Sequence, residues 1–293
     1  MKHILTLLTT LAIAAQLLAQ KPQEDSLPPR QKSDTIKIGK LILITKRDKK
    51  GAPNKVEIKN DTIKVDSNAY SSKAKKKRSN VSTKYFDFDL GFNNYTDNTN
   101  YGSVVANNIL KATSNRAAPN QSSFDLNTGK SINFNLWIFN QKVNIIQHKL
   151  NFKYGLGIEI FNFRYNSNLT FNKTNPTTII TDSINFNKNK LTVKYLTIPL
   201  MLTLNPSGKK SGFSISAGAS ISYRYGAHTK QKSDERGKQK QRDDYDLNPL
   251  KLALVGDIGY KWLRLYTSVA LTPLHQRGLE LTPYTVGFRF SKW

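Results

Sequence analysis

The 293-residue sequence contains no cysteine, and its acidic residues are fewer than half as numerous as its basic ones. Without cysteine the chain has no disulfide, no thiolate metal site and no lipid anchor attached through a cysteine sulfur. Beyond its N-terminal segment it also lacks any run of about 18 apolar residues, the length that a membrane helix needs. These absences exclude a disulfide-stapled secreted domain and a helical membrane protein.

The charge of the chain is strongly positive, because 45 lysines and arginines stand against 20 acidic residues, a formal net charge of +25. Such a protein binds polyanions, either nucleic acids or phosphate-bearing membrane surfaces. The N-terminus favours the second, because Lys2 and His3 precede an apolar run over Ile4–Ala19 that is typical of a secretory signal. We expect residues 1–19 to be a cleaved signal peptide, and outer-membrane lipid and lipopolysaccharide, not nucleic acid, to be the partner.

Residues 20–83 differ in composition from the rest and are expected to form a basic periplasmic extension. Two of its segments alternate as strands do, Thr35–Thr45 and Lys55–Val65, with Gly51–Asn54 between them. Two interpretations stay open. The extension is either a solvated linker or a small β-hairpin that contacts a periplasmic protein partner.

The clearest fold signal is a pair of alternating segments on either side of a turn at residues 205–208. From Leu196 to Leu204 every even residue is apolar, and from Phe213 to Tyr225 every odd residue is apolar, with mostly small or polar residues between. Such segments exceed the roughly 5 to 6 residues of strands in soluble sheets and match the roughly 9 to 11 residues of strands that cross a bilayer. The pattern predicts a transmembrane β-barrel.

The alternation recurs over residues 84–293, which predicts an all-β fold: an eight-stranded antiparallel barrel in the outer membrane of a Gram-negative bacterium. Short connections near Val143, Ser207 and Tyr260 alternate with long ones, as periplasmic turns alternate with outer loops in such barrels. Both termini are then periplasmic. The predicted strands are Tyr85–Asn93, Lys130–Asn140, Leu150–Tyr165, Leu196–Leu204, Phe213–Tyr225, Leu250–Tyr260, Trp262–Leu271 and Pro283–Trp293.

Eight strands leave a lumen just wide enough to be filled by side chains, so an open solute channel is not expected. Charged residues at inward positions are too costly to leave unpaired, and we expect them to form an ion-pair network that acts as a structural plug. These residues are Asp87, Asp89, Lys153, Glu159, Arg224, Lys251, Asp257, Arg264 and Arg289.

The residue types that catalysis uses, histidine above all, are scattered along the sequence. The histidines after the signal segment fall in predicted turns and loops: His148, His228 and His275. His228 or His275, together with an outer-loop Ser233, Asp246 or Glu280, would make an acyl-transfer site facing lipid A, but no spacing supports one. Solvated histidines are the better interpretation, and we expect no enzyme activity, no catalytic residue, no cofactor and no metal site.

Three short motifs resemble a known family. The segments Tyr195–Leu200 (YLTIPL) and Gly287–Phe290 (GFRF) are similar to the outer-membrane β-barrel proteins of Bacteroidota that include the PorT-like group, and Asp34–Lys40 (DTIKIGK) resembles segments that precede some of these barrels. The resemblance implies the barrel fold and a part in type IX secretion. The chain departs from the family in its last residues, because three residues, ending in Trp293, follow the last outward aromatic, Phe290.

We therefore expect a structural or binding protein that works through its outer loops and its periplasmic extension. The alternatives are a secretion-machinery component and, less favoured, a lipid A-modifying barrel enzyme. One pairing is specific: a two-residue loop at Tyr260 and Lys261 places Asp257 directly opposite Arg264, so that opposite charges meet inside the barrel.

Overall fold

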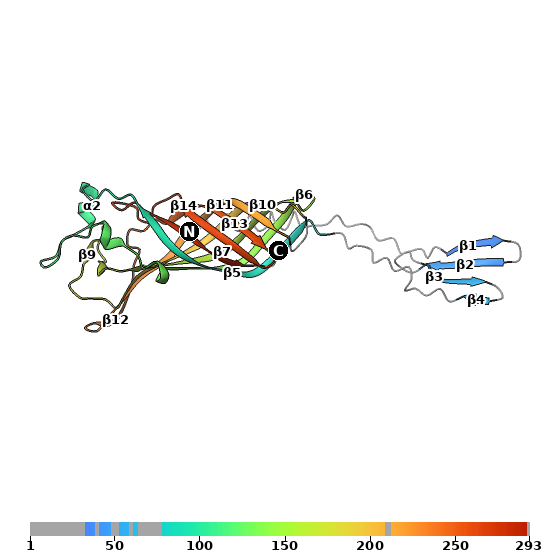
Figure 1. Ribbon diagram of the computed structural model, residues 1–293, viewed down its shortest axis with the longest axis horizontal. Coiled ribbons are helices and arrows are strands. Elements are labelled where there is room, and N and C mark those ends of the chain that lie inside the picture. The colour runs from blue at the N-terminus through green and yellow to red at the C-terminus, as the bar shows by residue number, and fades with distance from the viewer. Residues whose placement is uncertain are drawn as a thin grey trace. The chain divides into compact units, whose positions relative to one another are not determined.

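The computed structural model describes the backbone of four short strands between residues 33 and 63, and residues 78–208 and 212–291 in full (Figure 1). The chain divides into two compact units, Met1–Lys77 and Arg78–Trp293. The predicted signal peptide, residues 1–19, lies outside the described residues. Among the helices in the described ranges, none is long and apolar enough to cross a membrane.

The first unit contains an antiparallel sheet in which the strands follow one another in chain order. The prediction of one strand each at Thr35–Thr45 and Lys55–Val65 is wrong, because each of these segments forms a hairpin. Ile38 pairs with Leu41, and Ile58 pairs with Asp61, so that only two residues separate the strands of each hairpin. The strands are β1 (Ser33–Ile38), β2 (Leu41–Arg47), β3 (Pro53–Ile58) and β4 (Asp61–Ile63).

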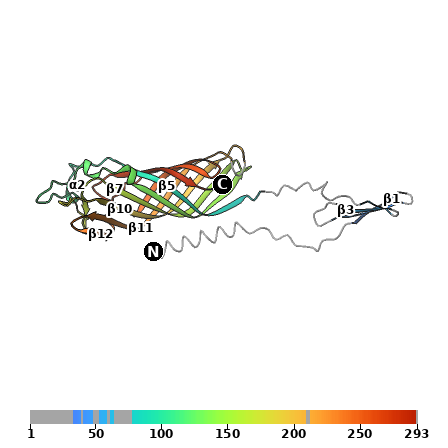
Figure 2. The same cartoon turned by 60° about the horizontal axis from the view of Figure 1, so that its bottom comes forward.

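The second unit is a closed antiparallel barrel of eight tilted strands, as predicted (Figures 1 and 2). Around the barrel the order is β10-β7-β6-β5-β15-β14-β13-β11, and pairing of β11 with β10 closes it. The strands are β5 (Val81–Asp97), β6 (Ile132–Ile146), β7 (Leu150–Tyr165), β10 (Lys188–Leu204), β11 (Ser214–Ser233), β13 (Leu250–Tyr260), β14 (Leu263–Ala270) and β15 (Leu281–Phe290).

The two ends of the barrel differ in their connections. At one end, called here the turn end, residues 147–149, 205–213 and 261–262 join consecutive strands. The first of these turns was predicted near Val143, but β6 continues to Ile146. At the other end, the loop end, the connections are longer and contain further elements. They are α2 (Val104–Ile109), η1 (Gln121–Phe124), η2 (Thr128–Lys130), β8 (Leu169–Phe171), β9 (Ile179–Thr181) and β12 (Gly237–Arg242).

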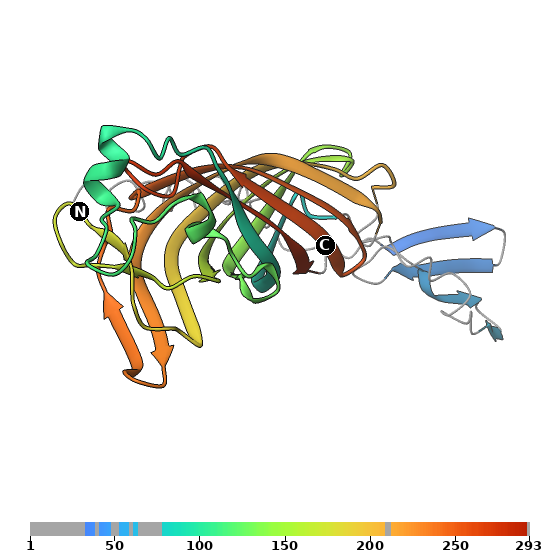
Figure 3. The same cartoon turned by 60° about the vertical axis from the view of Figure 1, so that its left-hand side comes forward.

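The strand β11 is long enough to pair with two different strands along its length. Its first half, Ser214–Tyr223, pairs with β13, and its last part, His228–Ser233, pairs with β12. Figure 3 shows the β11–β12 hairpin, in orange, extending away from the barrel strands. Because β10 pairs with β11 over its whole length, the barrel wall continues at the loop end as a small sheet of β7, β10, β11 and β12.

The polarity of the barrel wall reverses along the strands. In β7 the inward side chains are polar or small as far as Glu159, and then become Phe161, Phe163 and Tyr165. The outward side chains are apolar as far as Ile160 and then become polar. The inward aromatics belong to a buried apolar core at the loop end, together with Phe124, Leu169, Ile179, Leu191, Val193, Tyr245, Leu247 and Leu281.

Toward the turn end the outward face is a band of apolar side chains open to the surroundings. Leu90 is 51% exposed, Leu202 is 52% exposed and Leu254 is 54% exposed. A soluble monomer does not leave such a continuous apolar surface in water. The band is the surface that faces lipid in a membrane barrel, with the polar side chains inside it.

Candidate functional site

The interior of the barrel gathers eight of the nine charged residues that the sequence pointed to. Each is at least nine-tenths buried, and the four carboxylates and four cations balance in formal charge. The carboxylates are Asp87, Asp89, Glu159 and Asp257, and the cations are Lys153, Lys251, Arg264 and Arg289. Charge balance matters here because an uncompensated charge in a buried site is costly.

Asp257 on β13 is the centre of this interior network. Its Oδ1 accepts a hydrogen bond from Arg264 Nε at 2.7 Å, and its Oδ2 lies 3.2 Å from Lys153 Nζ and 3.1 Å from Arg289 Nη1. Three cations from three different strands thus share one carboxylate, and the contacts cross the lumen from β7 to β15.

Asp89 on β5 forms the second carboxylate centre. Arg289 binds it with two parallel hydrogen bonds, Nε to Oδ1 at 2.7 Å and Nη2 to Oδ2 at 2.8 Å, the strongest geometry for this pair. Trp137 Nε1 donates to the same carboxylate at 2.8 Å, and the Arg289 guanidinium lies 5.0 Å from the Trp137 ring centroid. The pair therefore joins the first and last strands of the barrel.

Two smaller contacts lie beside these carboxylate centres. Lys251 Nζ lies 2.5 Å from Glu159 Oε2 and 4.4 Å from the ring centroid of Phe161, where the polar interior meets the apolar core. Asp87 accepts from Ser291 Oγ at 2.8 Å. Arg224 does not join the network: it is half-buried beside the bulge in the β10–β11 pairing and donates to the Leu247 carbonyl at 3.1 Å.

The predicted register between β13 and β14 is wrong by two residues, although Asp257 and Arg264 do meet. The two-residue loop is Lys261 and Trp262, so Arg264 lies opposite Gly259 and Asp257 lies opposite Tyr266. A Cβ on Gly259 would lie 2.5 Å from Arg264 Cγ, which shows that the arginine side chain occupies the space above this glycine. From there the guanidinium reaches Asp257 diagonally.

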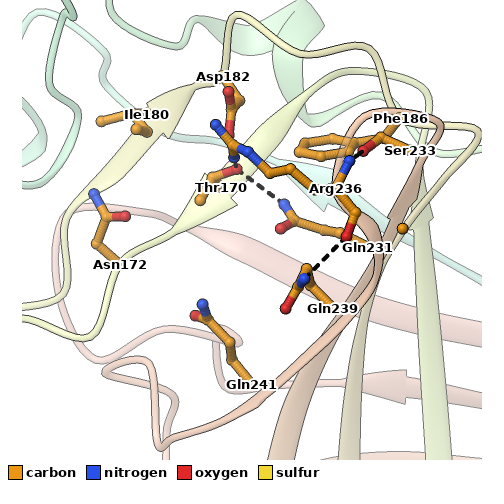
Figure 4. Close-up of a pocket in the computed structure, with 11 residues that line it drawn as sticks. Thr170, Asn172, Ile180, Asp182, Phe186, Gln231, Ser233, Arg236, Gln239 and Gln241 are labelled. Atoms are coloured by element: carbon orange, nitrogen blue, oxygen red, sulfur yellow. Dashed lines mark hydrogen bonds and ion pairs between the residues drawn. The ribbon is translucent and has the colours of Figure 1, made fainter.

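A pocket of about 400 Å³ lies at the loop end between two hairpins, β8–β9 and β11–β12 (Figure 4). Amide and hydroxyl side chains dominate its lining, and Phe186 contributes a ring. The lining residues are Thr170, Asn172, Ile180, Asp182, Phe186, Gln231, Ser233, Arg236, Gly237, Gln239 and Gln241.

Hydrogen bonds hold several of these groups in place. Arg236 Nη1 lies 2.7 Å from Asp182 Oδ2, which joins the two hairpins across the pocket. Gln231 Nε2 donates to Thr170 Oγ1 at 2.9 Å, and Gln239 Nε2 donates to the Arg236 carbonyl at 3.0 Å. The Gln241 side chain makes no hydrogen bond to the other residues drawn in Figure 4. The pocket thus presents amide donors and acceptors to a ligand.

The histidines do not assemble with a nucleophile in the described part of the chain. His228 and Ser233 point to opposite faces of β11, since they are five residues apart on one strand. The expectation that the loop histidines are solvated is wrong for His275, which is only 3% exposed and stacks on Phe171. Burial lowers the pKa of His275 to about 4, so its imidazole is neutral at physiological pH. No cluster of potential metal ligands occurs among the described residues.

The pocket was missed at the level of sequence, although a signal was present. Residues 237–242 read GKQKQR, a strict alternation of lysine and glutamine that a strand separates into two faces. The glutamines of β12 line the pocket and its basic residues occupy the other face.

Comparison with known proteins agrees with the architecture. A family model described as "Outer membrane protein beta-barrel domain" matches residues 82–276, which cover seven of the eight barrel strands and the pocket. No curated protein matches the chain. With its closed eight-stranded barrel, its apolar outer band and this match over most of its length, the chain belongs to the outer-membrane β-barrel protein family.

Proposed function

We propose that the protein is a non-conducting binding protein of the outer membrane, which takes a hydroxyl-rich, uncharged ligand such as a saccharide into the pocket at its loop end. The observation that carries the proposal is the pocket itself, an amide-lined cavity between two hairpins at the loop end of the barrel. Long loops face the outside in outer-membrane barrels, which supports a pocket that is open to external ligands.

The interior supports a role other than transport. Asp257 and Asp89 tie together strands on different sides of the barrel, and an apolar core follows this network at the loop end. A solute would have to break buried ion pairs and then pass through packed aromatic side chains. Both steps are costly.

The pocket chemistry supports a ligand rich in hydroxyl groups. Side-chain amides each offer two donors and one acceptor with two lone pairs, which suits hydroxyl groups that both donate and accept. The Arg236–Asp182 ion pair is internally neutralised, so it adds directed hydrogen bonds without selecting a net charge. Phe186 supplies an apolar ring surface against which a sugar ring packs.

Binding to an array of oligosaccharides by the purified, detergent-solubilised protein tests the proposal. Replacing Gln239 and Gln241 together by alanine should reduce binding of any retained glycan by about tenfold or more, because two neutral hydrogen-bonding groups of about 1 kcal/mol each are lost. Gln121→Ala, on an exposed loop-end residue outside the pocket, is the matched control. Equal binding by both variants would exclude the pocket as the site.

A second candidate function is a component of a secretion machinery of the type IX kind, the role that resemblance to PorT-like barrels of Bacteroidota implies. One observation favours it: in the sheet of the first unit, β1 and β4 each pair with a single described strand, which leaves an edge for strand addition by a protein partner. Deletion of residues 21–77 should then remove a co-purifying protein while the barrel remains in the membrane. An unchanged set of co-purifying proteins would contradict this role.

We also propose that the protein is not an enzyme. The separation of His228 from Ser233 across β11 and the buried, neutral His275 support this proposal over a lipid A-modifying activity. Mass spectrometry of lipid A from a deletion strain should show an unchanged structure, and a changed acylation or phosphorylation pattern would contradict the proposal.

A further inference from the structure

The outward side of the small loop-end sheet carries a dense set of cations, called here the basic face. It lies on the opposite side of β11 and β12 from the glutamines that line the pocket. Its members come from four neighbouring strands and are Arg164 on β7, Lys188, Lys190 and Lys194 on β10, Lys230 and Lys232 on β11, and Lys238, Lys240 and Arg242 on β12.

The strand register places these cations side by side. Lys190 pairs with Arg164 on one side and with Lys230 on the other, and Lys230 pairs in turn with Lys240, so one row of four cations crosses four strands. A second row joins three lysines in the same way, at positions 188, 232 and 238. Like charges directly opposite each other destabilise a sheet, and here they recur in consecutive rows.

Within residues 78–208 and 212–291 the protein supplies no carboxylate partner for these rows. Among the described residues, no ion pair joins a member of the basic face to a carboxylate. Burial, followed by the charges of Lys188, Lys230 and Arg164, lowers the pKa of Lys190 to about 8. Burial and the neighbouring cations together disfavour the charged form of Lys190, and an anionic ligand would relieve the repulsion between the cations.

The basic face begins where the lipid-facing apolar band ends, on the side of the loop end. On β10 the last outward apolar residue is Leu196, and Lys194 is the next outward residue; on β11 the half-exposed Tyr225 comes just before the basic stretch. Exposed aromatics at that level mark the membrane interface of such barrels. The first cations therefore lie at the depth of lipid headgroups.

The height of the upper rows identifies the kind of lipid. At about 3.3 Å per residue and a tilt of about 40°, each residue rises roughly 2.5 Å, so the six residues from Leu196 to Lys190 span about 15 Å. The headgroup layer of an ordinary phospholipid is only roughly 6 Å deep on each side. Its phosphates reach Lys194 but not the rows above, which need a taller anionic headgroup.

We propose that the basic face binds the anionic saccharide headgroup of an outer-leaflet glycolipid, a phosphate-bearing core oligosaccharide of the lipopolysaccharide kind. The lower cations bind the phosphates next to the acyl chains, and the upper rows bind charges farther along the saccharide. The site is independent of the pocket on the other face of the same sheet, so its test does not depend on the proposed saccharide binding there.

Native mass spectrometry of the detergent-solubilised full chain, titrated with purified lipopolysaccharide that retains its phosphorylated core, tests the site. The variant Lys190→Gln/Lys230→Gln/Lys240→Gln removes one row, and Lys111→Gln/Lys130→Gln/Lys173→Gln removes the same charge from exposed lysines elsewhere at the loop end. At about 1 kcal/mol for each lysine, the row variant should bind roughly 100-fold more weakly, and the control variant should match the wild type.

Two further arms separate this ligand from other polyanions. Phosphatidylglycerol should bind equally to the wild type and the row variant, because its phosphate does not reach the row. Without glycolipid the row variant should unfold at a higher temperature than the wild type, since repulsion between the lysines is relieved, and saturating lipopolysaccharide should reverse that order.

Equal lipopolysaccharide binding by the row variant and the wild type would overturn the proposal. An equal loss of binding for phosphatidylglycerol would also overturn it, as would a soluble oligonucleotide that binds as tightly as the glycolipid. A second variant, Lys188→Gln/Lys232→Gln/Lys238→Gln, repeats the test on the neighbouring row.

Discussion

The two halves of the barrel wall, toward the turn end and toward the loop end, share their strands and differ in polarity. Near the turn end the wall is apolar outside and charged inside, whereas near the loop end, along β7, β10 and β11, it is basic outside and mostly apolar inside. In β7 the change takes place between Glu159 and Arg164 on both faces, and β10 changes between Leu196 and Val193. One continuous strand therefore buries polar side chains near the turn end and apolar side chains near the loop end.

The difference shows that the surroundings, not the sheet, set which side chains a strand can bury. Next to lipid the apolar face points outward and polar groups must find partners in the lumen. Beyond the lipid the outward face contacts water, so the apolar side chains are buried on the inward face, as in a soluble protein. The level of the reversal marks the membrane boundary on this molecule, and the following predictions test that boundary.

The largest effect is expected in the polar half. Asp257→Ala leaves Lys153, Arg264 and Arg289 with a buried charge excess, and it should lower the free energy of unfolding by on the order of 5 kcal/mol. Urea unfolding in detergent measures the loss. Adding Arg264→Ala to Asp257→Ala should cost less than the sum of the single changes, and simple additivity would show that the two residues act independently.

A cavity in the apolar half should cost somewhat less and act locally. Phe163 is fully buried in the loop-end core, so Phe163→Ala should destabilise the protein by about 3 to 4 kcal/mol. The loss should appear as faster proteolysis in residues 98–131 and 166–187, while the unheated protein keeps its shifted gel mobility. A barrel that loses that mobility together with the loops would show that the two halves unfold as one unit.

A charge placed on the outward face should distinguish the halves directly. Leu200→Lys puts a cation in the lipid-facing band and should cost about 2 to 4 kcal/mol. Thr96→Lys, at an exposed outward position of β5 near the loop end, should cost less than about 0.5 kcal/mol because it lies beyond the lipid. Folding titrations into lipid vesicles measure the free energy of folding of both variants. Comparable losses in the two would show that the membrane boundary lies elsewhere on the strands.

The smallest effect concerns pH and the apolar half alone. Burial holds the pKa of His275 at about 4, below its ordinary value of about 6.5, so the unfolded chain takes up the proton first. Stability is therefore fully present above pH 6.5 and falls as the pH drops toward 4, by about 1 kcal/mol at pH 5.5. Thermal unfolding of the wild type and of His275→Phe between pH 7.5 and 5.5 measures it, and an equal pH response in both would assign the effect to other groups.

Much of the barrel could be predicted because its pattern is local. The alternation in Leu150–Tyr165 and Leu250–Tyr260 defines those strands and their outward faces without any knowledge of neighbours. The same alternation led us to place charges such as Asp89 and Arg289 inside. What a strand touches across the lumen is not local, and the bidentate contact between these two could not be read from either segment.

The parts that were missed depend on such non-local information. The β13–β14 register was predicted from charge pairing alone, but Arg264 is long enough to reach Asp257 diagonally across Gly259, so two registers satisfy the same pair. The pocket needs two hairpins whose sequences are separated by about fifty residues. The loop-end core had a signal, the change to Phe161, Phe163 and Tyr165 on the inward face, but alternation alone does not say which solvent lies outside.

The contact between Arg289 and Asp89 also has a consequence for how the chain is assembled. Its two residues are 200 positions apart and lie on the last and first barrel strands, β15 and β5, which pair only when the barrel closes. Contacts this distant in sequence form late, because the entropy of closing the loop must be overcome first. Before β15 pairs with β5, Arg289 is not in place to contact both Asp89 and Asp257. The ion-pair network is therefore completed in the same step that closes the barrel. An unfinished chain cannot gain this stabilisation, which favours full-length molecules in the membrane over truncated ones.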